Sequence, residues 1–198
     1  MSIHLIIGPM FSGKTSRALD IINYNINNNI ETMVINHKTD LRYGNNIICS
    51  HDNISHKCYS FSKLNEIFNN NYIDIFNKSN FIIIDEAQFF TDLFHYVTLM
   101  ADQYNKNIVV IGLNGDINRN NFGDIYKLYP HANKIELLNA NCDKCNNEAQ
   151  FTIKINMSNI NSDNIIDIGH NDKYIPICRK CRKTIIEDPS QTLSTPSI

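Results

Sequence analysis

The residues with the clearest chemical potential stand near the start of the chain and fit the pattern G-x-x-x-x-G-K-[ST]. They are Gly8-Pro9-Met10-Phe11-Ser12-Gly13-Lys14-Thr15. Glycines allow the backbone to curl so that its N–H groups face phosphate oxygens, and a following helix adds the positive end of its dipole. Lys14 would neutralise charge on the β- and γ-phosphates, and the Thr15 hydroxyl would bind Mg²⁺. The pattern predicts a loop that binds the phosphates of ATP with magnesium, in preference to an ordinary glycine-rich turn.

Two acids, Asp85 and Glu86, directly follow the apolar run at 81–84. An acid at the end of a strand opposite a phosphate loop can hold Mg²⁺ directly or through water, and we assign this role to Asp85. The second acid, Glu86, is placed to accept a proton from a nucleophile. The pair alone also fits two solvated acids, but together with the loop it predicts phosphoryl transfer.

Four of the six cysteines form two Cys-x-x-Cys pairs, Cys142 with Cys145 and Cys178 with Cys181. Four thiolates satisfy the tetrahedral coordination of a structural Zn²⁺, which leaves no open position for catalysis. The pairs are separated by 32 residues. Common sites of this kind have ~15–20, so the insert must loop out and return. Redox-active pairs are the competing interpretation, which the presence of two pairs in one chain disfavours.

The elements that must position these residues can be predicted from apolar patterns. Four short apolar runs indicate buried strands, at residues 3–7, 32–36, 81–84 and 108–111. Three stretches indicate helices, at about 15–24, 61–68 and 92–104, with Thr91 as the cap of the last. Strands separated by helical stretches predict a parallel α/β sheet, in which ligands bind at the carboxyl ends of the strands. The polar clusters at 8–15, 85–86 and 112–119 follow three of these strands.

The composition limits the class of protein. The 198 residues are 42% hydrophobic, which suits one domain with a real core and a small appendage. A formal net charge of −2 disfavours a protein that holds nucleic-acid backbones. No apolar run approaches the ~20 residues that span a bilayer, and the first residues lack the pattern of a signal peptide. We expect a soluble cytoplasmic protein without membrane or nucleic-acid partners, in which Cys49 and Cys58 are thiols without a role.

The character of the sequence changes after about Asn141. We predict a phosphate-binding domain at 1–140, a zinc-binding domain at 141–186, and a disordered tail at 187–198 that contains Pro, Ser and Thr without a core pattern.

With these motifs in place, the chain resembles the cellular and poxviral type of the thymidine kinase family over residues 3–185. Besides the phosphate loop and the cysteines, the resemblance is carried by Asp40-Leu41-Arg42-Tyr43, Ser50-His51-Asp52, Asp85-Glu86-Ala87-Gln88-Phe89-Phe90, Gly112-Leu113-Asn114-Gly115-Asp116, Phe122-Gly123 and Asp172-Lys173-Tyr174. It implies a P-loop sheet of the RecA-like kind flanked by helices, followed by a small zinc-binding domain whose insert folds over the nucleoside as a lasso. The long spacer between the cysteine pairs is explained by such a lasso.

The resemblance also implies roles on the phosphate side. Glu86 would be the general base for the nucleoside 5′-hydroxyl, while Asp85 and Thr15 would serve Mg²⁺. Asp40 and Arg42 would lie near the transferring phosphate. ATP and thymidine would be the substrates, dTTP a feedback inhibitor, and the assembly a homotetramer.

On the substrate side the resemblance implies seven residues, which are Met10, Phe89, Leu113, Phe122, Thr152, Asp172 and Tyr174. Phe89 and Tyr174 would sandwich the thymine ring, and Phe122 would pack close by. Thr152 and Asp172 would help to hold the lasso, whose backbone would bind the base.

The chain departs from the family pattern at Asn114, Ile117, Asn118, Lys154 and His170, all on the substrate side. A deoxynucleoside kinase with relaxed base choice is therefore an alternative. A nucleic-acid-binding ATPase with a zinc ribbon is another, supported only by the basic run at 179–183. A catalytically inactive homologue is disfavoured because the phosphate loop and both acids are present.

Overall fold

A sheet of six parallel strands forms the centre of the protein, in the order β5-β2-β6-β7-β1-β8. The bounds are β1 Ser2–Gly8, β2 Thr32–His37, β5 Tyr59–Phe61, β6 Phe81–Ile84, β7 Asn107–Leu113 and β8 Lys134–Leu137. This computed structural model describes residues 1–40, 44, 46–50, 54–155 and 173–187. The four predicted strands are confirmed as β1, β2, β6 and β7. The apolar pattern does not reveal β5, which has three residues, or β8, which is largely exposed.

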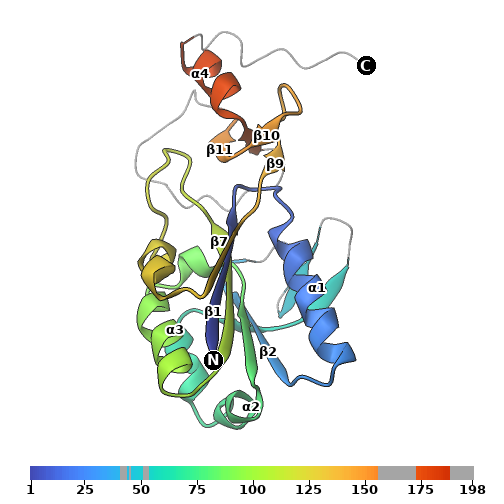
Figure 1. Cartoon of the computed structure of the whole chain (residues 1–198), viewed down its shortest axis with the longest axis vertical. Helices are drawn as coiled ribbons and strands as arrows, with labels where there is room; N and C mark the ends of the chain where they lie inside the picture. Colours follow the sequence, from blue (N-terminus) through green and yellow to red (C-terminus); the bar gives the residue numbers. More distant parts are fainter. Residues whose placement is uncertain (41–43, 45, 51–53, 156–172, 188–198) are drawn as a thin grey trace.

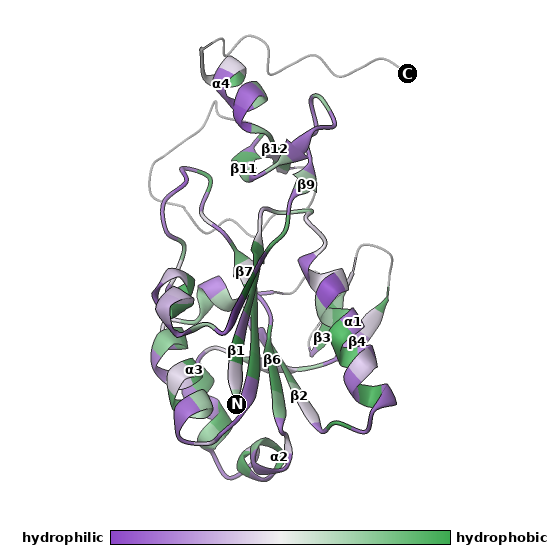
Figure 2. Cartoon of the chain, in the orientation of Figure 1, coloured by the Kyte–Doolittle hydropathy of each residue, from purple (hydrophilic) through white to green (hydrophobic). Residues whose placement is uncertain are grey.

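Helices cover both faces of the sheet, with α1 (Lys14–Asn27) on one side and α3 (Leu93–Asp102) on the other (Figure 1). Because side chains alternate along a strand, Leu5 of β1 packs in the core with α3, and Ile6 packs in the core with α1. Figure 2 shows the same arrangement as hydrophobic strands between helices of mixed character. Burial on both faces explains why these strands are continuously apolar instead of alternating.

Two helix predictions need correction. The helix predicted at 61–68 is instead the end of β5 followed by the 3₁₀ helix η1 (Leu64–Phe68), because the Glu66 carboxylate accepts the N–H groups of Ser62 and Lys63 and forms a turn there. Helix α3 begins at Leu93 and is preceded by Asp92, so Thr91 is not its cap. The Asp92 carboxylate accepts the N–H groups of Leu64 and Asn65, both at 3.1 Å, and so caps η1.

The remaining helices are short. They are α2 (Ile73–Lys78), η2 (Ala87–Phe89), η3 (Ile125–His131) and α4 (Arg179–Glu187). None of the helices within the described ranges combines the length and apolar character that crossing a bilayer requires. Glu187, predicted as the first residue of the tail, ends α4, and the rest of that predicted tail lies outside the described residues.

Three small antiparallel pairs complete the structure: β3 (Ile47–Cys49) with β4 (Ser55–Lys57), β9 (Ala140–Asn141) with β10 (Glu148–Ala149), and β11 (Phe151–Lys154) with β12 (Tyr174–Ile177). The last two pairs and α4 form a small module beyond the carboxyl ends of the central strands (Figure 1). Cys49 and Cys58 are free thiols, and burial raises the pKa of Cys58 to about 12.

Candidate active site

The predicted phosphate loop connects β1 to α1, which is the context that such a loop requires. A Cβ on Gly8 would lie 2.5 Å from the Leu138 carbonyl oxygen and 2.6 Å from Ser12 Oγ, so the tight turn excludes any side chain. Gly13 has φ 77° and directly precedes α1. Phe11 also has positive φ, at 63°, which is costly for a residue with a side chain. Its ring packs against the cysteine module, and this contact offsets the strain.

The Lys14 ammonium lies over this loop. Its Nζ donates to the Pro9 carbonyl oxygen and lies 3.4 Å from Ser12 Oγ. The lysine that the motif requires is therefore positioned above the turn that would hold phosphates.

Thr15 and Asp85 meet although 70 residues separate them, because the carboxyl ends of β1 and β6 lie at one edge of the sheet with only β7 between them. Thr15 Oγ1 lies 3.5 Å from Asp85 Oδ2. Asp85 is 4% exposed, and its N–H donates to the Ile35 carbonyl oxygen. A hydroxyl and a carboxylate beside a phosphate loop form the hard oxygen set that fits Mg²⁺.

Glu86 follows Asp85 with φ 51°, in the left-handed region. Its N–H donates to Asp85 Oδ1 at 2.9 Å, and its Oε2 accepts from Gln88 Nε2. The sequence motifs indicate no role for Gln88, which is buried, because no spacing rule links an amide to an acid two residues away.

Asp40 also lies near this edge, after β2. The amide of Asn36, which is 1% exposed, donates from Nδ2 to Asp40 Oδ2 at 3.0 Å. The Asp40 N–H donates to the His37 carbonyl oxygen. Arg42, predicted to act beside Asp40, lies outside the described residues.

Phe89 contacts the rings of two other side chains, Phe122 and His37. It meets Phe122 edge to face, with ring centroids 5.5 Å apart, and the His37 ring at 5.6 Å. Thr39 N–H donates to His37 Nδ1 and the His37 Nε2 faces the Ser62 carbonyl oxygen, so the ring is neutral with its hydrogen on Nε2. Burial lowers the pKa of His37, in keeping with this form.

The substrate residues predicted from the resemblance fall on both parts of the structure. Leu113 ends β7, Phe89 lies in η2, and Tyr174 is a buried residue of β12. Met10 N–H donates to Thr152 Oγ1 at 2.9 Å, which joins the phosphate loop to β11. Asp172 lies outside the described residues.

Asn114 provides a second link between the two parts. Its Nδ2 donates to the Gln150 carbonyl oxygen at 3.0 Å. A carboxylate at this position could not donate this bond, so the link requires the amide of Asn114.

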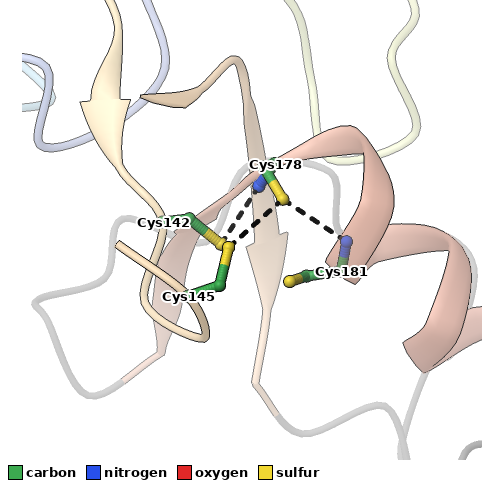
Figure 3. A group of neighbouring side chains, drawn as sticks. All are labelled: Cys142, Cys145, Cys178 and Cys181. Carbon is green, nitrogen blue, oxygen red and sulfur yellow. Dashed lines mark hydrogen bonds between the residues drawn. The ribbon is translucent and has the colours of Figure 1, made fainter. Parts of the chain in front are cut away.

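The four cysteines of the two pairs converge in the module, with sulfur atoms within 4.8 Å of one another (Figure 3). Cys142 and Cys145 come from the turn between β9 and β10, and Cys178 and Cys181 from the start of α4. Tetrahedral coordination with ~2.3 Å zinc–sulfur bonds places sulfurs about 3.8 Å apart. The Cys145 and Cys178 sulfurs are 3.7 Å apart, so the donor set and its spacing fit Zn²⁺.

Backbone N–H groups support ionised sulfur in this cluster. Burial opposes ionisation of Cys142, but N–H groups of Cys178, Lys144 and Cys145 outweigh it and lower the pKa to about 7. Burial and the neighbouring thiols raise the pKa of Cys181 to about 12. All four of these cysteines are free thiols in the structure.

Part of the basic run at 179–183 makes contacts within the cysteine module. The Arg179 guanidinium lies 4.9 Å from the Phe151 ring centroid, with Arg119 on the same ring at 5.9 Å. Burial, with the charges of Arg119 and Arg179, lowers the pKa of Arg182. These contacts weaken the interpretation of this run as a nucleic-acid surface.

Ammonium, hydroxyl and carboxylate groups thus meet where a parallel sheet binds ligands, and the fold and site define the chain as a P-loop phosphotransferase. A family model described as thymidine kinase matches residues 1–182. The chain is 45% identical over 184 residues to the thymidine kinase of Amsacta moorei entomopoxvirus, covering 91% of this chain and 97% of the relative. It is 35% identical over 179 residues to thymidine kinase a of Arabidopsis thaliana, covering 90% and 74%. A fowlpox virus (strain NVSL) thymidine kinase is 37% identical over 184 residues, covering 91% and 96%.

The chain belongs to the thymidine kinase family, and the resemblance seen in its motifs is confirmed. Thymidine kinase activity follows from this membership.

Proposed function

We propose that this chain transfers the γ-phosphoryl group of ATP to the 5′-hydroxyl of thymidine with the residues of the site described above. The observation that carries the proposal is the approach of Thr15 to Asp85 at the mouth of the phosphate loop, with Glu86 next in the chain. These groups join a phosphate-binding loop to a proton acceptor at one edge of the sheet, which is what phosphoryl transfer needs.

In the proposed reaction, residues 8–15 hold the ATP phosphates through backbone N–H groups, and Lys14 neutralises charge that develops on the transferred group. Glu86 removes the proton from the 5′-hydroxyl as its oxygen attacks phosphorus. Thr15 and Asp85 would hold Mg²⁺, which when bound neutralises phosphate charge. Asp40 and Arg42 would orient the transferring phosphate.

The thymine ring would lie between Phe89 and Tyr174, with Met10, Leu113 and Phe122 around it. The ring contact between Phe89 and Phe122 supports this arrangement, since it holds the Phe89 ring in one orientation. A slot between two rings accepts one flat pyrimidine and excludes a purine by width. Thr152 and Asp172 would hold the lasso over the base.

For the cysteine module we propose one structural Zn²⁺ per chain, held by Cys142, Cys145, Cys178 and Cys181. The fit of the four sulfurs to tetrahedral spacing supports it. The family resemblance also supports a homotetramer in the cytoplasm that dTTP inhibits, as well as the division into domains at 1–140 and 141–186.

The test is a phosphorylation assay of the purified protein with ATP, Mg²⁺ and a panel of deoxynucleosides. We expect thymidine to be preferred over deoxycytidine and over purine nucleosides. Equal kcat/KM for deoxycytidine and thymidine would instead establish the alternative, a deoxynucleoside kinase with relaxed base choice.

The variant Glu86→Gln tests the chemistry. It should bind both substrates but lose turnover by about 10²–10⁴-fold, as expected for a general base. Glu31→Gln is the matched control, because Glu31 is exposed and lies before β2. If thymidine affinity collapses in Glu86→Gln while turnover at saturation does not, Glu86 is a binding residue and the mechanism is wrong.

A further inference from the structure

We propose that Gln88 is a positioning residue for the reaction, which holds the Glu86 carboxylate in the orientation that proton transfer requires. The inference rests on the proposed role of Glu86 as general base. Its basis is a pair of hydrogen bonds from one buried amide: Gln88 Nε2 donates to Glu86 Oε2, and Leu113 N–H donates to Gln88 Oε1 at 3.1 Å.

The orientation of the Gln88 amide is determined by its partners. Its oxygen accepts from a backbone N–H, so its NH₂ group must face the carboxylate. The reverse orientation would place two oxygens together at Glu86 and two donors together at Leu113. Gln88 is 4% exposed, so little water is present to satisfy that arrangement.

Two glycines make room for this side chain and its backbone. A Cβ on Gly112 would lie 2.6 Å from Gln88 Oε1, and a Cβ on Gly123 would lie 2.2 Å from the Gln88 carbonyl oxygen. Gly123 also has φ 63°, which a residue with a side chain rarely adopts. The neighbouring turns therefore fit closely around Gln88, and they leave its amide one position.

Glu86 needs such support because its backbone is strained. A left-handed φ of 51° at a non-glycine residue persists only when its surroundings hold it. Asp85 Oδ1 fixes the Glu86 N–H, and Gln88 fixes the carboxylate at the other end of the residue. The amide also links Glu86 to the end of β7, where Leu113 would line the base pocket. Gln88 thus fixes the position of the general base Glu86 relative to Leu113 of the proposed pocket wall.

The first test is Gln88→Met in the full chain, which keeps side-chain length and removes both hydrogen bonds. Loss of a hydrogen bond to a charged group should lower kcat by about 10- to 100-fold. The KM for thymidine should stay within about threefold. Gln103→Met is the matched control, since Gln103 is exposed at the end of α3. A larger change in KM with kcat maintained would overturn the inference.

The second test is Gln88→Glu, which asks whether the side chain at position 88 contacts the Glu86 carboxylate during the reaction. This nearly isosteric variant still accepts from Leu113 N–H but places a second carboxyl group beside Glu86. Two adjacent carboxyl groups share a proton, so the acidic limb of the kcat–pH profile should move to higher pH. A profile that coincides with that of the wild type would overturn the inference, because it would show that the side chain at position 88 does not contact the Glu86 carboxylate in the active enzyme.

A double-mutant cycle with Glu86→Ala distinguishes the inference from the proposed function. If Gln88 acts through Glu86, Gln88→Met should cause no further loss of kcat in the Glu86→Ala protein. If the two losses of kcat multiply in the double variant, the role of Gln88 is overturned, while the role of Glu86 as general base still stands. Near-normal turnover in Glu86→Ala alone would refute the proposed role of Glu86 as general base.

Discussion

Replacement of Thr152 by Val tests the link between the phosphate loop and the cysteine module. Val has nearly the shape of Thr but has no hydroxyl, so Met10 N–H loses the acceptor that it reaches at 2.9 Å. Thr152 is 7% exposed, and water has little access to replace the lost bond. The variant therefore leaves a backbone donor of the phosphate loop without its partner.

The expected magnitude follows from the partial burial of this hydrogen bond, whose acceptor Thr152 is buried. A buried polar group that loses its partner costs about 1–3 kcal/mol of unfolding free energy. For a protein of this size, each kcal/mol lowers Tm by roughly 2–4 °C. We therefore expect Thr152→Val to lower Tm by about 2–12 °C, and to lower kcat/KM for ATP because the loop is no longer held from the module side.

Thermal unfolding of the zinc-loaded protein measures this effect, with Thr152→Ser as the control that keeps the hydroxyl. Removal of zinc by a chelator should shrink the difference between Thr152→Val and wild type, since β12, the partner of β11, leads into Cys178. If Thr152→Val and Thr152→Ser both have the Tm of the wild type, the hydrogen bond does not stabilise the loop and the reasoning is refuted.

Three further predictions concern other parts of the chain. Lys14→Ala should abolish phosphoryl transfer and keep the Tm of the wild type, because it removes a charge and leaves the backbone loop; an active variant in the kinase assay would contradict the assignment. Metal analysis should find about one zinc per chain, and Cys181→Ser should release it more readily to a chelator; disulfides in place of metal would refute the module. Glu136, whose pKa is lowered from 4.5 to about 2 chiefly by the Arg17 hydrogen bond, stabilises the fold when ionised. Glu136→Gln should lower the unfolding free energy by about 1 kcal/mol near neutral pH, a modest value because Arg17 is 38% exposed. In urea titrations this loss should shrink as the pH falls from 4.5 toward 2, and a constant loss would contradict it.

The local patterns of the sequence determined much of this protein. The phosphate loop is contiguous, and its glycines, lysine and threonine are recognisable without any neighbour. The strands β1, β2, β6 and β7 are buried on both faces, so each is a short apolar run with recognisable ends. The paired spacing of the cysteines likewise predicts the cluster of four sulfur atoms that the structure brings together.

The tertiary structure decided which distant residues meet. The insertion of β7 between β1 and β6 brings Thr15 to Asp85, and no spacing in the chain predicts that order. The use of Asp92 to cap η1 instead of α3 depends on two helices packing together. The role of Gln88 depends on a backbone N–H that lies 25 residues away in the chain. A hydrogen bond requires two groups within about 3 Å in a defined direction, and for groups far apart in sequence only the packed chain establishes that geometry.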